Sequence, residues 1–407
     1  MQRREFMKML ALGTAATAGL AGLGIPEAFA AKKETAKGKK KVKRSKQKEW
    51  AKKNYKGMST LIFPSFTPDF KAIDEEGVRI DMANSIKHGF VGSMCFPVGV
   101  TPETHAQFTN AACDEARGKK IFPADIISEK TLEEDLAQIA LNEKNGCTHL
   151  LISPDRSGLG KTDDEIVEIY RKRCEATSLP VWIFAMMAPH YRKFGPSGVP
   201  YKAFDKIADF PNVVGIKYSH PLEMGTSFFL SELLADRLLI SPVNFDFMPI
   251  LMKFYGSQCS GQWSVEAIQS PEKPYAVDMM NAMLAGRWEE AHRLYNIIQP
   301  ALNDFFSMQA PCIRAGVSPW QHRKYLQWCV GGNGGLVYIA NKRYQETRGK
   351  LIPTLDQKER DFIKNWYRKI GIEPYDGPDE EFMVGKAAYK RGVRAKDLAH
   401  IQWYSEK

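Results

Sequence analysis

A repeated alternation of short apolar runs and longer amphipathic stretches between residues 60 and 261 is the feature that most limits the folds open to this chain. The short runs are rich in β-branched and aromatic residues, and eight of them are expected to be strands: Thr60–Phe66, Phe90–Phe96, Ile121–Ile126, Thr148–Ser153, Val181–Met186, Val213–Lys217, Leu238–Val243 and Ser257–Gly261. Their apolar residues do not alternate with polar ones, which is typical of parallel strands covered on both faces. Eight strand–helix repeats predict an α/β fold, the (β/α)8 TIM barrel. A doubly wound open sheet is the alternative, but about five or six strands would complete it.

Helical periods separate the expected strands and take over after the last of them. Within the repeats, helices are expected at Asp74–Lys87, Thr131–Asn145, Thr162–Thr177 and Glu223–Ala235. Thr162 and Glu165 have the spacing of a capping box. Further helices are expected at Tyr275–Leu284, Trp288–Phe306, Trp320–Val330 and Gln357–Lys369. We therefore expect a barrel over residues 57–283, a C-terminal helical region over 284–372, and a polar tail over 373–407 that wraps the surface.

The N-terminus resembles a twin-arginine export signal over residues 1–30. Arg3-Arg4 precedes Phe6 and a mild apolar stretch, rich in Ala and Gly, over residues 9–25. Ala28-Phe29-Ala30 then supplies the small residues of a cleavage site. We expect the twin-arginine translocase to be a partner during export and the mature protein to be periplasmic. The alternative is an uncleaved N-terminal anchor.

The formal net charge of +10 lies in a Lys-rich linker over residues 31–56, which carries 13 Lys and Arg and two Glu. Residues 57–407 hold 41 basic and 43 acidic side chains. The expected fold is therefore not basic, and no nucleic-acid partner is expected. The linker is either a solvated spacer or a tether to an anionic surface. No later window has about 18 consecutive apolar residues, so no membrane-spanning helix is expected.

The seven cysteines indicate neither a metal site nor a cofactor. Their spacing lacks the C-x-x-C, C-x-x-C-H and His-x₃-His patterns of zinc, haem and redox sites, and several fall in apolar runs. Gly331-Gly332-Asn333-Gly334-Gly335 follows an expected helix rather than a strand, so a dinucleotide loop is not expected there. We predict no metal and no cofactor.

Lys217 is the candidate catalytic residue because it closes the sixth expected strand. Catalytic groups of this fold lie at the C-terminal ends of strands. Burial there lowers the pKa of an amine, and the neutral amine can form a Schiff base with a carbonyl. The alternative is a lysine that extends to solvent or pairs with a carboxylate. Tyr218 is expected to point to the opposite face of the strand.

Several segments together resemble the dihydrodipicolinate synthase / N-acetylneuraminate lyase family of class I aldolases. The carrying segments include Ser65-Phe66-Thr67-Pro68, Gly146-Cys147-Thr148-His149-Leu150-Leu151-Ile152-Ser153-Pro154, Leu179-Pro180-Val181-Trp182-Ile183-Phe184, Gly215-Ile216-Lys217-Tyr218-Ser219 and Ala285-Gly286-Arg287-Trp288-Glu289-Glu290-Ala291. The resemblance covers about residues 58–371 and implies a barrel with a C-terminal helical bundle, a homotetramer, and Schiff-base chemistry on a 2-oxo acid. It implies that Lys217 forms the imine and that Ser65 and Thr67 bind substrate.

The chain departs from the family at the residues that move protons. The family's Gly-Thr-Thr-Gly-Glu signature, whose threonines bind the substrate carboxylate, is replaced by a segment containing Val98 and Gly99. Phe184 stands where the family has a proton-shuttling tyrosine. Loss of a general acid or base typically costs about 10²–10⁴-fold in rate, so an unmodified relay is not expected. Val98, Gly99 and Phe184 are nevertheless expected to line the substrate site.

Replacement groups are expected after strands five and seven. His190 and Tyr191 are candidate acid–base residues, and Arg192 and Asn244 are candidate substrate ligands. His220 is a further acid–base candidate. Two functions remain open: an exported lyase or hydro-lyase that forms a Lys217 imine with a non-standard proton relay, and a non-catalytic exported barrel that binds a small ligand or a protein partner.

Overall fold

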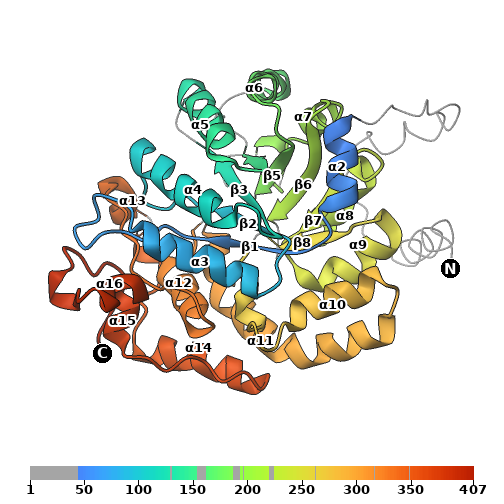
Figure 1. The fold of residues 1–407 in the computed structure, drawn as a ribbon. Coiled ribbons are helices and arrows are strands. Elements are labelled where there is room, and N and C mark those ends of the chain that lie inside the picture. Colours follow the sequence, from blue (N-terminus) through green and yellow to red (C-terminus); the bar gives the residue numbers. More distant parts are fainter. Residues whose placement is uncertain are drawn as a thin grey trace, which may run out of the picture. The chain divides into compact units, whose positions relative to one another are not determined.

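Eight parallel strands, each followed by one or more helices, form the core of the computed structural model (Figure 1). The structure describes residues 45–128, 131–153, 162–186, 193–195, 197–219, 224–261, 263–315, 317–347 and 349–407. The strands are β1 Gly57–Ile62, β2 Gly92–Cys95, β3 Phe122–Ile127, β4 His149–Ile152, β5 Val181–Met186, β6 Val213–Ser219, β7 Leu239–Pro242 and β8 Cys259–Gly261. The predicted TIM barrel is confirmed.

One described helix, α2, precedes the first strand, and the other helices follow the strands in sequence and cover the barrel. The barrel helices are α2 Lys46–Asn54, α3 Glu75–Lys87, α4 Pro102–Ala116, α5 Leu132–Asn145, α6 Asp163–Glu175, α7 Tyr201–Ile207, α8 Met224–Leu234 and α9 Met248–Tyr255, with 3₁₀ turns η5 Phe245–Phe247 and η6 Val265–Ile268. The later helices are α10 Tyr275–Leu284, α11 Trp288–Arg314, α12 Trp320–Cys329, α13 Lys342–Thr347, α14 Gln357–Lys369, α15 Asp379–Val384 and α16 Lys386–Lys390, with η7 Gly349–Leu351 and η8 Ala395–Asp397. The predicted capping box at Thr162 is present at the start of α6.

Side-chain hydroxyls connect β7 and β8, the two strands at the ends of the sheet order, and so close the barrel. The backbone ladder runs in the order β7-β6-β5-β4-β3-β2-β1-β8. Between β8 and β7, the Ser260 hydroxyl donates to the Pro242 carbonyl at 2.9 Å, and the Ser257 hydroxyl donates to the Ile240 carbonyl at 2.5 Å. The nearly closed ring places all eight strand C-termini at one end, which we call the mouth.

The opposite end of the barrel is filled by aromatic rings. Tyr55 follows α2 directly, and its ring centroid lies 5.2 Å from that of Trp182 and 4.9 Å from that of His149. Gln258 holds this segment through a hydrogen bond to the Tyr55 carbonyl. The last part of the segment treated as a linker from its composition, Lys46–Asn54, is therefore a helix packed on the barrel.

The C-terminal segment is part of the hydrophobic core. Phe382 on α15 is fully buried, and the Gly335 amide donates to its carbonyl at 2.6 Å. A parallel bridge pairs Leu355 with Tyr404, close to the end of the chain. The prediction that residues 373–407 wrap the surface as a polar tail is wrong in this respect, because scattered apolar residues anchor the segment without forming a long period. In the described part of the chain, no helix is long and apolar enough to cross a bilayer.

Candidate active site

Lys217 points into the barrel near the C-terminal end of β6. Its neighbours Ile216 and Tyr218 pack in the outer layer between strands and helices, and the Tyr218 hydroxyl lies 3.3 Å from the Ser231 hydroxyl of α8. Because successive side chains of a strand point to opposite faces, Lys217 and Ser219 point inward together. The prediction that Tyr218 points away from the site is confirmed.

The Lys217 amine lies between a hydroxyl and an aromatic ring. Its Nζ donates to the Ser219 Oγ at 2.8 Å and lies 4.3 Å from the centroid of the Phe184 ring. Phe184 and Lys217 are direct neighbours in the β5–β6 ladder. The lysine is 3% exposed, and no carboxylate among the described residues pairs with it. It is therefore a buried amine without a counter-charge in this part of the chain.

Burial makes this amine reactive near neutral pH. Loss of hydration, together with the positive charge of Arg323, lowers the pKa of Lys217 to about 7. About half of such amines are neutral at pH 7, whereas an amine with a pKa near 10.4 is almost fully protonated there. A neutral amine beside a proton-carrying hydroxyl is the arrangement that attacks a carbonyl.

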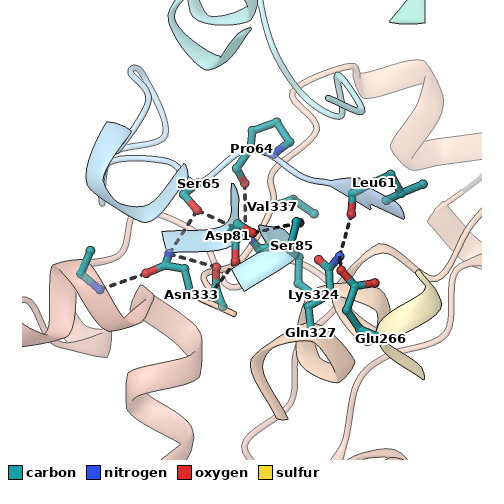
Figure 2. A network of polar contacts seen from close by, with 12 residues as sticks. Leu61, Pro64, Ser65, Asp81, Ser85, Glu266, Lys324, Gln327, Asn333 and Val337 are labelled. Carbon is teal, nitrogen blue, oxygen red and sulfur yellow. Dashed lines mark hydrogen bonds and ion pairs between the residues drawn. The ribbon is translucent and has the colours of Figure 1, made fainter. Parts of the chain in front are cut away.

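A second buried lysine, Lys324 on α12, shows by contrast what a structural lysine looks like (Figure 2). Its Nζ donates to the Pro64 carbonyl at 3.3 Å, to the Ser65 hydroxyl at 3.2 Å and to the Asp81 carboxylate at 3.4 Å. Burial lowers the pKa of Lys324 but the charge of Asp81 opposes that shift. With all three protons donated and an ion pair formed, Lys324 is held in place and has no free role as a nucleophile.

A buried carboxyl group belongs to the same network. Glu266, which follows β8 in η6, accepts hydrogen bonds from the Thr60 hydroxyl at 2.7 Å and from the Gln327 amide at 3.2 Å. Figure 2 shows Glu266 beside Gln327. Burial raises the pKa of Glu266 to about 7. Gln327 also donates to the Leu61 carbonyl at 2.7 Å. These bonds fix α12 to the ends of β1 and β8.

The other described candidate residues are buried or make contacts of their own. Ser65 is buried against Lys324 and against Asn333, whose amide donates to it at 3.1 Å. Thr67 donates to the Asp69 carboxylate in a local turn. Of the remaining predicted residues, Val98 is buried, Gly99 has a positive φ of 73° and lies against the Tyr338 carbonyl, and Asn244 caps η5 through the Asp246 amide.

The three candidates after strand five, and one after strand six, lie outside the described residues: His190, Tyr191, Arg192 and His220. Phe184 is a predicted substrate-site residue that the structure places against Lys217. Within the described ranges, no group of three His, Cys, Asp or Glu side chains is placed to share a metal ion.

Two groups near the amine were missed from the sequence. Ser219 could have been found, because a residue two positions after an inward-facing strand residue also faces inward. Arg323 carries no such signal: it lies on α12, far along the chain, and its relation to Lys217 depends on how that helix packs.

No protein-family model matches the chain, and a search of curated proteins finds no match. Solved structures of the dihydrodipicolinate synthase family do match its fold. YagE from Escherichia coli K12, a prophage protein of that family in complex with pyruvate, superposes with a TM-score of 0.61 at 11% identity, covering 78% of this chain and 99% of YagE. Dihydrodipicolinate synthase from Aquifex aeolicus gives 0.60 at 13% identity over 79% of this chain and 100% of its own.

The dihydrodipicolinate synthase from Agrobacterium tumefaciens gives a TM-score of 0.56 at 18% identity, covering 79% of this chain and 99% of its own. Nearly the whole length of each of these proteins thus has a counterpart here. At these identities the comparison concerns the fold. The chain has the fold of the dihydrodipicolinate synthase structures.

Proposed function

We propose that this protein is a lyase or hydro-lyase of the class I aldolase type, which binds a 2-oxo acid through an imine of Lys217. The observation that supports it most is a buried lysine at the mouth whose pKa is about 7 and which no described carboxylate neutralises. The shared fold with dihydrodipicolinate synthase structures supports the same reaction class.

The geometry suggests how the imine forms. The neutral Lys217 Nζ attacks the 2-oxo carbon, and the carbonyl electron pair moves to oxygen. The amine nitrogen loses protons, the oxygen gains them, and water leaves as the C=N bond forms. Ser219, at 2.8 Å from Nζ, is placed to pass a proton between these atoms. The imine then withdraws electrons from the neighbouring carbon, where a C–C or C–O bond is broken. His190 and Tyr191 remain candidates for the proton transfer at that carbon.

Reductive trapping tests the imine. The protein is incubated with pyruvate and borohydride at pH 7, digested, and analysed by mass spectrometry. The expected result is a stable adduct on the Lys217 peptide and none on the Lys324 peptide, which is an equally buried control held by an ion pair. Lys217→Met should abolish the adduct. Absence of an adduct with pyruvate and with a panel of larger 2-oxo acids would refute the proposal.

Phe184 favours a second function, a non-catalytic barrel that binds a small ligand. Its ring lies 4.3 Å from the amine and has no proton to exchange. An adduct that forms at Lys217 without release of any product from the 2-oxo acid panel would favour the binder. Turnover of a panel member would exclude it.

Export, assembly and the linker belong to the same proposal. We expect residues 1–30 to direct the protein through the twin-arginine translocase, the Lys-rich linker to be a solvated spacer or a contact to an anionic surface, and the fold to form a homo-oligomer. Replacing Arg3 and Arg4 by Lys should retain the protein in the cytoplasm, as read by fractionation. Sedimentation velocity measures the oligomeric state, and a monomer at micromolar concentration would contradict the assembly.

A further inference from the structure

One face of α12 lies across the mouth of the barrel. Trp320 begins the helix, and its ring centroid lies 6.1 Å from that of Phe63 and 5.4 Å from that of Phe96, which follow β1 and β2. Seven residues later, Gln327 bonds to the Leu61 carbonyl of β1. Residues spaced by three and four along a helix share a face, so Arg323 lies on the face that these contacts hold against the strand ends.

Arg323 is partly exposed at the solvent surface, and it differs from the buried Arg173 and Arg360 in that no described carboxylate lies within ion-pair distance of it. The charge of Glu266 nevertheless opposes the lowering of its pKa by burial. Arg173 pairs with the Asp135 carboxylate, and Arg360 pairs with Asp379 at 3.1 Å. Arg323 donates from one terminal nitrogen to the Gln309 amide oxygen, which carries no charge. Its Nε is buried and has no hydrogen-bond partner among the described residues. A desolvated cation without a direct ion pair is costly, and an anion that accepted from the guanidinium would offset that cost.

Lys217 and Arg323 approach the mouth from opposite parts of the chain. Each is in a largely desolvated position, and the charge of Arg323 opposes protonation of Lys217. The segment with Val98 offers no hydroxyl for a substrate carboxylate: Val98 is apolar and buried, and Gly99 has no side chain. A 2-oxo acid has its carboxylate on the carbon next to the reacting carbonyl, so it presents an anion beside the amine.

We infer that Arg323 binds the carboxylate of the 2-oxo acid whose carbonyl reacts with Lys217, and so selects acids over neutral ketones. The inference rests on the proposed function for the identity of the ligand. Gln309 acts as a positioning residue, because it orients the guanidinium without being charged itself. The network of Figure 2 holds α12 in place through Lys324 and Gln327.

Measuring ligand binding to a protein that cannot form an imine tests the Arg323 carboxylate site separately from the Lys217 imine. Pyruvate binding is measured by calorimetry with Lys217→Met and with Lys217→Met/Arg323→Gln. Loss of a charge-assisted bond to a carboxylate should weaken binding by about 10- to 100-fold in the double variant. Pyruvamide, which has the same shape and no charge, should bind both variants equally. Arg323→Lys in the same background should give intermediate pyruvate affinity, since it keeps the charge and loses the planar fork.

Arg368→Gln is the matched control, because this α14 arginine is exposed and pairs with Glu373. It should leave pyruvate affinity unchanged. Equal pyruvate affinity of Lys217→Met and its Arg323→Gln derivative, with equal melting temperatures, would overturn the inference. So would binding of pyruvamide as tightly as pyruvate to Lys217→Met. A failure of borohydride trapping in the wild-type protein, with the Arg323 effect intact, would refute the imine but not the carboxylate site.

Discussion

Replacing Lys217 by Met should make the protein more stable, and by an amount that depends on pH. Methionine has a similar length, fits an apolar position and needs no hydration. The pKa of Lys217 is about 7 in the folded protein, against 10.5 for a free lysine. Between these two values the unfolded chain holds a proton that the folded protein has released, so wild-type stability rises with pH across this window. Below pH 7 both states are protonated, and the full cost of the buried charge is present.

The magnitude follows from the separation of the two pKa values. Each unit corresponds to about 1.4 kcal/mol, so the lysine costs about 5 kcal/mol at pH 6 and about 2 kcal/mol at pH 9. The advantage of Lys217→Met over the wild type should therefore shrink by about 3 kcal/mol between these pH values. Comparing the two proteins at each pH cancels the titration of every group that they share.

Urea unfolding followed by tryptophan fluorescence at pH 6 and pH 9 measures this difference. Lys253→Met on α9 is the control, because Lys253 is exposed and its replacement should change stability equally at both pH values. If Lys217→Met and the wild type respond to pH in parallel, the amine is not desolvated as the structure indicates. The assignment of a neutral nucleophile at pH 7 would then fail.

Three further substitutions test the packing and the chemistry around the site. Gly215→Ala would place a methyl group 2.3 Å from the Trp182 ring, so the free energy of unfolding from urea titration should fall by about 1–3 kcal/mol; no change would show that the ring moves freely. Asp135→Asn leaves Arg173 buried without its counter-charge and should cost about 3–5 kcal/mol in the same titration; a loss below about 1 kcal/mol would contradict the ion pair. Ser219→Ala should slow borohydride-trapped imine formation by roughly 10²-fold at pH 7, and an unchanged rate would exclude a proton-passing role.

The repeat of strand and helix periods predicted the barrel because each unit is specified locally. The predicted ends of strands were wrong where apolar residues continue past the last residue of a strand. The first strand was expected at Thr60–Phe66 and is found at Gly57–Ile62. Pro64, which has no N–H to donate to a sheet, interrupts the apolar run after Ile62, and the Gly57 amide instead pairs with the Gln258 carbonyl.

The position of Lys217 was predictable, but its electrostatic surroundings were not. A lysine at the end of an apolar strand has its direction set by strand alternation. Arg323 reaches the mouth through the packing of Trp320 and Gln327, which depends on tertiary structure that no local spacing records. Ser65 was predicted to be a substrate ligand from its sequence context, and the hydrogen bonds that it accepts from Lys324 and Asn333 depend on tertiary packing that the sequence did not indicate.

The contacts of α12 also limit how this scaffold can change its substrate. Lys324 and Gln327 hold α12 in place through their hydrogen bonds. Arg323 lies in the same helix, between Trp320 and these two residues. A substitution that moves the helix to admit a different ligand must also break bonds to the ends of the barrel strands. New specificity would therefore arise more readily from exchange of the whole C-terminal helical segment than from stepwise change within α12. Such an exchange would keep Arg323 with Lys324 and Gln327, and it would require the incoming helix to find the same backbone acceptors, the carbonyls of Leu61 and Pro64.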